Sequence, residues 1–146
     1  MRCEIRLILG LCVALAVARP VASQTSSFNG FNVIGNTLGV TSLTEEDASD
    51  IFRGKKSVWS NGKPMLIVLP STKNPSAANI ARNLFSTDAQ GMHRYWLSQV
   101  FQGRANPPVF LERWEDVILK VKSVEGAVAV IPKGVSVPAE LIIPIR

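Results

Sequence analysis

Hydroxyl, amide and amine groups gather in one short stretch of the chain, residues 70–76, which reads Pro-Ser-Thr-Lys-Asn-Pro-Ser. The stretch follows an apolar run and precedes an expected helix. Backbone amides and hydroxyls at a helix N-terminus can hold an oxyanion without a formal counter-charge. The candidate ligand-binding residues are Ser71, Thr72, Lys73 and Ser76, and Lys73 adds a positive charge. In the alternative interpretation, Ser76 only caps the helix and the remaining residues form an ordinary loop.

The same sequence offers little for catalysis or metal binding. Its only histidine, His93, falls inside an expected helix, where a packing or surface role is the usual one. Residues 54–57, Gly-Lys-Lys-Ser, resemble the end of a phosphate-binding P-loop, but Ser49 stands where that motif requires its first glycine. Acidic residues cluster at expected helix starts, where capping explains them. We therefore expect no enzyme, no cofactor and no metal site.

Short apolar runs between turn residues predict strands, and apolar residues at helical spacing predict helices. Expected strands are residues 31–34, 65–69, 127–131 and 141–145, and Pro144 makes the last an edge strand or a strand end. Residues 103–108 form a break in the pattern, with two prolines at its end.

Four helices are expected, each with its own start signal or apolar stripe. Ser42 and Glu45 form a capping box for the first, which ends at Gly54. Ser76 caps the second, and Asp88 caps a third that runs through Phe101. The fourth carries its apolar stripe over residues 114–121. Because strands and helices alternate, the fold class is α/β, a single small domain with helices packed on a mixed sheet.

Residues 1–23 have the pattern of a secretory signal peptide. Two arginines precede an apolar run over residues 7–18, which is shorter than the roughly 20 residues that span a bilayer. Val21-Ala22-Ser23 offers small residues for cleavage near Ser23. We therefore expect an exported, periplasmic protein whose domain, residues 24–146, has no membrane span.

Removal of residues 1–23 changes both the cysteine count and the charge. Cys3 and Cys12 lie within the expected signal peptide, so no disulfide is available to residues 24–146. The chain carries 16 Lys and Arg against 11 Asp and Glu, of which three and one lie in residues 1–23, leaving a net charge of +3. This charge is spread along the chain, which does not suggest a nucleic-acid partner.

Several segments, in a fixed order, resemble the phosphate-binding proteins of ABC transporters, within the type 2 periplasmic-binding-protein superfamily. Residues 43–47, 50–55 and 59–64 read LTEED, DIFRGK and WSNGKP, and residues 124–132 read VEGAVAVIP. Between them lie an apolar strand, a Ser/Thr loop, Tyr95-Trp96 and residues 101–104, FQGR. The resemblance implies a periplasmic-binding-protein-like fold. Residues 103–108 resemble the short, single-domain members of the family rather than the full receptors, which close two lobes around phosphate.

The resemblance also identifies the loop that matches the phosphate loop of the family. The family loop reads Ser-Gly-Thr at a helix N-terminus, whereas residues 74–77 here read Asn-Pro-Ser-Ala, and Ser76 occupies the corresponding helix start. Pro75 has no amide to donate. The implied ligand is phosphate or a similar anion, and the implied partner is a transporter or another envelope protein.

Two functions therefore remain open. The first is an exported solute-binding-like protein that binds phosphate or another oxyanion at residues 71–76, with help from the loop at residues 36–41. The second is an accessory envelope interaction module with the same fold and no small-molecule ligand. Its candidate contacts are Trp59, Tyr95, Trp96 and Phe101, residue types that more often belong to a core.

Overall fold

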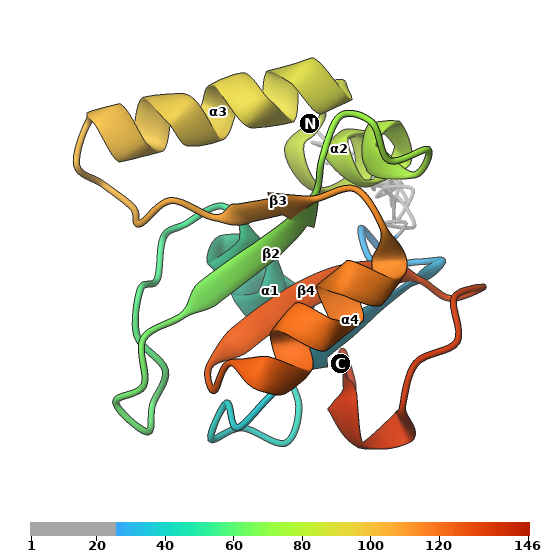
Figure 1. Ribbon diagram of the computed structural model, residues 1–146. Helices are drawn as coiled ribbons and strands as arrows, with labels where there is room; N and C mark the ends of the chain where they lie inside the picture. Colours follow the sequence, from blue (N-terminus) through green and yellow to red (C-terminus); the bar gives the residue numbers. More distant parts are fainter. Residues whose placement is uncertain (1–25) are drawn as a thin grey trace, which may run out of the picture.

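The computed structural model describes residues 26–146, so the expected signal peptide and its cleavage site near Ser23 lie outside the described residues. Figure 1 shows the arrangement of the elements. In chain order they are β1 (Phe31–Gly35), α1 (Glu45–Phe52), β2 (Leu66–Pro70), α2 (Ala77–Phe85), α3 (Ala89–Phe101), β3 (Val109–Leu111), α4 (Trp114–Ser123), β4 (Ala127–Pro132), a 3-10 turn (Ala139–Leu141) and β5 (Ile142–Ile143).

The five strands form one mixed sheet in the order β3-β2-β4-β1-β5, which confirms the predicted fold class. Strand β2 pairs in parallel with both β3 and β4, whereas β1 pairs antiparallel with β4 and β5. Strand β5 lies at one edge, as Pro144 predicts, but it has two residues because Leu141 belongs to the 3-10 turn. Strand β3, at the other edge, begins directly after the predicted break at residues 103–108 and was not predicted.

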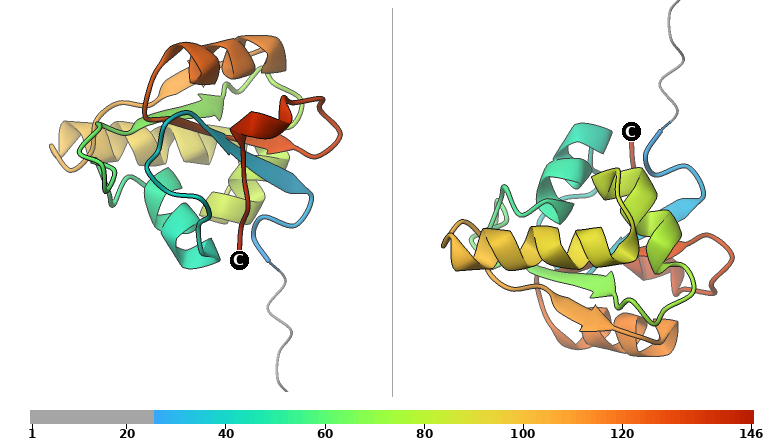
Figure 2. Two further views of the ribbon diagram at one scale, coloured as in Figure 1. Left: turned by 90° about the horizontal axis from the view of Figure 1, so that it is seen from below. Right: turned by 90° about the horizontal axis from the view of Figure 1, so that it is seen from above.

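Helices cover both faces of the sheet, and this explains the apolar composition of its central strands. Figure 2 shows α4 on one face and α1 and α2 on the other. One core cluster joins Val33, Ile67 and Val128 to residues of α1, α2 and α3, while Val117 and Val121 of α4 pack on the opposite face. Strand β4 is buried from Ala127 to Ile131, as expected for a strand covered on both sides.

The start of α1 differs from the prediction by two residues. The N-cap is Thr44, whose hydroxyl accepts a hydrogen bond from the backbone amide of Asp47 at 3.1 Å. The predicted Ser42–Glu45 capping box is therefore wrong, because Leu43 still pairs with the C-terminal segment at Ile145. Lys56, together with the Thr44 hydroxyl, lowers the pKa of Asp47 below its ordinary value.

The predicted cap of α3 is confirmed, since the Asp88 carboxylate accepts from the amide of Gly91 at 2.6 Å.

A close junction of three segments fixes the start of β4. The indole nitrogen of Trp59 donates to the carbonyl oxygen of Gly126 at 2.8 Å, and this tryptophan is buried. Gly126 adopts a positive φ of 85°, and a Cβ at this position would clash with the carbonyl oxygen of Pro64. Glycine is therefore required here both by the backbone conformation and by the neighbouring backbone.

No helix within residues 26–146 combines the length and apolar character that a membrane crossing requires.

We predict that Gly126→Ala destabilises the domain by at least about 2 kcal/mol, since the new methyl group adds a clash with backbone to the left-handed strain. Gly62→Ala is the matched control, because Gly62 has a similar φ of 81° but open space where its Cβ would lie. We expect about 1 kcal/mol for the control. Urea unfolding of both variants measures the difference, and equal losses would contradict this account of the junction.

Candidate functional site

The predicted binding loop lies at the carboxyl end of β2, next to the end of the edge strand β3. The amide of Ser71 donates to the carbonyl oxygen of Leu111 at 2.8 Å, so the loop continues the parallel pairing of β2 with β3. Helix α2 begins at Ala77, directly after the loop. In open α/β sheets, ligands commonly bind outside the carboxyl ends of parallel strands. The predicted residues therefore lie where this fold class places binding sites.

Asn74 organises this loop, and the sequence analysis did not single it out. Its side chain is only 4% exposed, and its Nδ2 donates to the carbonyl oxygen of Glu112 at 2.7 Å. Its Oδ1 accepts from the amide of Ser76 at 2.8 Å. Its own amide donates to the carbonyl oxygen of Ser71 at 3.0 Å. An asparagine whose side chain can accept from the amide two residues further on, shortly before a helix start, is the sequence signal for such a turn.

The role of Ser76 as a helix cap is a wrong prediction. Its side chain makes no capping hydrogen bond, and its own amide is already bonded to Asn74. The amide of Ala77 donates to the carbonyl oxygen of Asn74 at 3.0 Å. Within residues 26–146, the amides of Ala78 and Asn79 make no hydrogen bond to protein. The amides that α2 can offer to an anion are therefore those of Ala78 and Asn79.

The four candidate residues lie on one loop but in different environments. Thr72 and Lys73 are exposed, and Ser76 is partly exposed. The Oγ of Ser71 is buried and has no hydrogen-bond partner within residues 26–146. A buried hydroxyl without a partner is costly to a fold. The base of the loop therefore contains an unused hydrogen-bonding group, while Thr72 and Lys73 face solvent.

The loop at residues 36–41 does not take part in this site, so the predicted help from it is wrong. The amide of Asn36 donates to the carbonyl oxygen of Ala127, and Asn61 donates from its side chain to the carbonyl oxygen of Thr37. Ala127 begins β4 and pairs with Leu66 at the start of β2. The loop therefore lies at the opposite end of β2 from residues 71–76.

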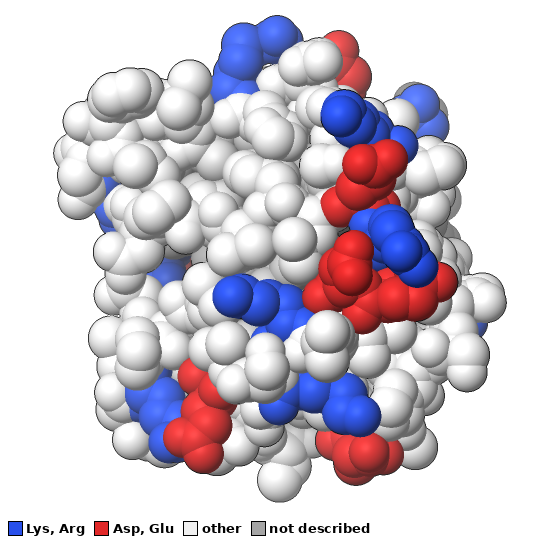
Figure 3. Space-filling view, in the orientation of Figure 1, with Lys and Arg blue, Asp and Glu red and all other residues white. Residues whose placement is uncertain are grey.

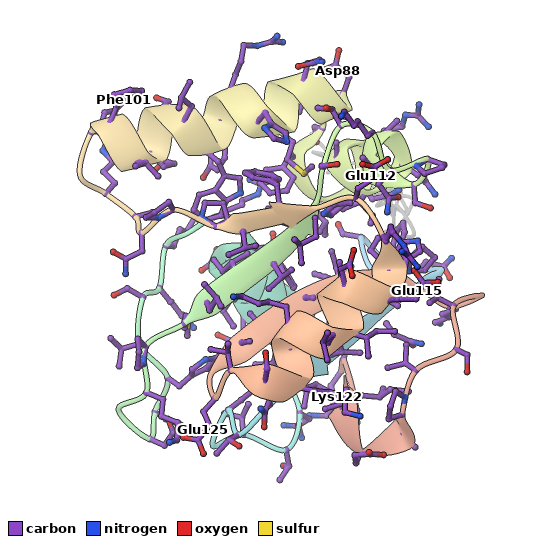
Figure 4. The ribbon with its side chains drawn as sticks, in the orientation of Figure 1. Asp88, Phe101, Glu112, Glu115, Lys122 and Glu125 are labelled. Atoms are coloured by element: carbon purple, nitrogen blue, oxygen red, sulfur yellow. The ribbon has the colours of Figure 1, made fainter. Side chains whose placement is uncertain are left out.

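Charged side chains of both signs lie on the side of the molecule that carries the loop. In Figure 3, basic and acidic residues alternate on the side of the molecule where α2 and the start of α4 lie. Figure 4 places Glu112 at the end of β3, close to α2, and Glu115 at the start of α4. The carboxylate of Glu112 opposes an anion at this site, whereas Lys73 favours one.

His93 has a packing role, consistent with the prediction for it. Its ring stacks on that of Phe110, with the ring centroids 3.8 Å apart. Its Nε2 is buried and has no hydrogen-bond partner within the described chain. Burial lowers the pKa of His93 below its ordinary value, because the charged ring loses its hydration. Residues 26–146 contain no group of three or more His, Cys, Asp or Glu side chains placed to hold a metal ion.

Three of the four candidate docking residues belong to the interior. Trp59 and Trp96 are buried, and the partly buried Tyr95 donates its hydroxyl to the carbonyl oxygen of Arg53 at 2.7 Å. Only Phe101 is available to a partner, since 83% of its surface is exposed.

Comparison with known proteins supports the fold. No family model matches the sequence, and no curated protein matches it either. Among solved structures, the chain is similar to an ABC-type phosphate transport receptor from Vibrio cholerae, with a TM-score of 0.58 and 16% sequence identity. The match covers 80% of this chain and 46% of the receptor, so this chain spans about half of the receptor's length. The five-stranded sheet with its four helices resembles one lobe of a periplasmic-binding protein.

We predict that Asn74→Ala costs about 2–3 kcal/mol of folding free energy, because it leaves the amide of Ser76 and the carbonyl group of Glu112 without their partner. Asn83→Ala is the matched control, since Asn83 is exposed and its side chain, within residues 26–146, bonds only to Asn79 of the same helix. We expect about 0.5 kcal/mol or less for the control. Chemical denaturation measures both, and a small effect at Asn74 would show that it does not hold the loop.

The lowered pKa of His93 predicts a pH dependence of stability. The unfolded chain takes up a proton near the ordinary histidine pKa of about 6.5, and the folded domain does so only at lower pH. The stability contributed by the neutral ring is therefore complete above that value and is lost as pH falls through the range between the two pKa values.

The matched variant is His93→Phe, which keeps an aromatic ring on Phe110 but cannot titrate. Thermal unfolding of both proteins between about pH 7.5 and about pH 5 tests the prediction. We expect wild type to lose stability relative to the variant as pH falls. A constant difference would rule out this role for His93.

Proposed function

We propose that this protein is exported to the periplasm and binds phosphate or another oxyanion at the N-terminus of α2. One observation carries the binding proposal: the amides of Ala78 and Asn79 have no protein acceptor within residues 26–146, and the exposed Lys73 belongs to the loop before them. Amides at a helix N-terminus bind anions through hydrogen bonds and through the helix dipole.

Further observations support the same proposal. The unpartnered hydroxyl of Ser71 lies at the base of the loop, and the hydroxyl of Thr72 is exposed beside Lys73. The fold resembles one lobe of a receptor for phosphate transport. The pattern of residues 1–23 supports export, and a transporter or another envelope protein is the partner that this fold suggests.

The open geometry sets the expected affinity. A site formed by one exposed loop removes little of a small anion from water, and the acidic residue Glu112, whose backbone carbonyl group bonds to Asn74, lies close to α2 (Figure 4). We therefore propose weak binding, with a dissociation constant on the order of 1 mM.

We predict that isothermal titration detects phosphate binding by the wild-type protein and that Lys73→Ala weakens it severalfold, because one favourable charge is lost. Glu112→Gln should strengthen it by a similar factor, because an opposing charge is removed. Lys122→Ala is the matched control, since Lys122 lies near the far end of α4 (Figure 4) and its loss changes the net charge equally.

Sulfate is titrated in parallel to define the ligand class. Binding of both anions supports a general oxyanion site, and a preference for phosphate supports the narrower function. Absence of heat above background for both anions at concentrations of about 10 mM would reject the proposal. Equal weakening by Lys73→Ala and Lys122→Ala would also reject it, since it would indicate binding through net charge alone.

A further inference from the structure

The C-terminal half of the outward face of α3 carries apolar side chains where a solvent-facing helix would carry polar ones. Gln90, Arg94, Leu97 and Phe101 recur at spacings of four, three and four residues, which places them along one stripe of the helix. Leu97 is 58% exposed and Phe101 83% exposed. Figure 4 shows Phe101 at the end of α3 far from Asp88. The stripe has the spacing of a helix–helix contact seam.

A hollow of about 250 Å³ lies beside this stripe, between α3 and the edge strand β3. His93, Trp96, Val100, Pro107, Pro108 and Phe110 contribute to its lining. Strand β3 is the last strand of the sheet on this side. In Figure 3 the area over the C-terminal half of α3 and over β3 is largely free of charged residues. A protruding aromatic side chain and an apolar hollow therefore share one face.

We infer that a second copy of this chain covers this face, with the two α3 helices packed antiparallel about a two-fold axis near Leu97. In this arrangement a residue that follows Leu97 by a given number of positions on one helix faces the residue that precedes Leu97 by the same number on the other helix. Phe101 of each copy then lies against the His93 end of α3 in the other copy, beside Phe110. A two-fold interface requires such self-complementarity, because each patch meets its own copy.

The charges on the stripe fit this pairing. Arg94 forms no ion pair within residues 26–146, and the hollow is lined by no Asp or Glu. The antiparallel arrangement places the guanidinium of Arg94 next to the ring of Phe101 of the second copy, and keeps it away from the other Arg94. An arginine beside an aromatic ring is a favourable contact, and both residue types are enriched in interfaces.

The size of the face predicts a weak dimer. Helix α3 has 13 residues and is therefore about 20 Å long. Together with the hollow, it buries on the order of 1,000 Å² in total, which is at the lower limit for a specific interface. We expect a dissociation constant on the order of 10 µM. This inference goes beyond the proposed anion site, because α3 and β3 form the interface whether or not residues 71–76 bind a ligand.

Sedimentation equilibrium at protein concentrations from about 1 µM to about 500 µM tests the inference. The protein is purified as it accumulates in cells that express the full chain. The wild-type protein should pass from monomer to dimer over this range. Phe101→Ser and Leu97→Lys should each weaken the dimer at least tenfold, and both positions are exposed, so the fold should persist. Circular dichroism confirms that each variant is folded.

Leu119→Lys is the matched control, since Leu119 is 65% exposed on α4, outside the proposed interface. This variant should dimerise like the wild type. A protein that stays monomeric up to the highest concentration would overturn the inference and leave this face to a different partner. A dimer that Leu119→Lys disrupts and Phe101→Ser does not would overturn it as well.

Discussion

The side chain of Asn74 joins three segments of the chain that meet at the carboxyl end of β2. It bonds to the amide of Ser76 before α2 and to the carbonyl group of Glu112 after β3, from a position that is 96% buried. A buried amide is tolerated only when its hydrogen-bonding groups are satisfied, so these contacts define the local geometry closely. The direction of α2, the end of the edge strand and the shape of the candidate site all depend on them.

The same contacts limit what the site can do. Asn74 occupies the amide of Ser76, and Pro75 has none, so the amides near the start of α2 that have no protein acceptor within residues 26–146 are those of Ala78 and Asn79. Lys73 is the loop's only positive charge, and the backbone of the acidic residue Glu112 bonds to Asn74 of the same loop. The structure thus combines a fold similar to part of a phosphate transport receptor with an exposed candidate loop. For the anion site that we propose, this exposure predicts weak binding.

The sequence predicted the α/β class, most elements and the cap at Asp88 because these depend on local residue patterns. It missed β3 because three residues after two prolines carry no periodic signal, and the strand exists only through its pairing with β2. It placed the cap of α1 at Ser42, where the first match to the capping pattern occurs, although β-pairing at Leu43 delays the helix to Thr44. The roles of Asn74 and of the loop at residues 36–41 depend on contacts between distant segments, which local patterns do not contain.

The most direct test of the central claim is a residue-resolved one, an amide ¹H–¹⁵N NMR titration with inorganic phosphate at constant ionic strength. The account predicts that the largest shifts occur at the amides of Ala78 and Asn79, with smaller shifts at Thr72 and Lys73, and that the bonded amide of Ser76 changes little. The absence of any shift, or shifts that are largest outside residues 71–79, would contradict it.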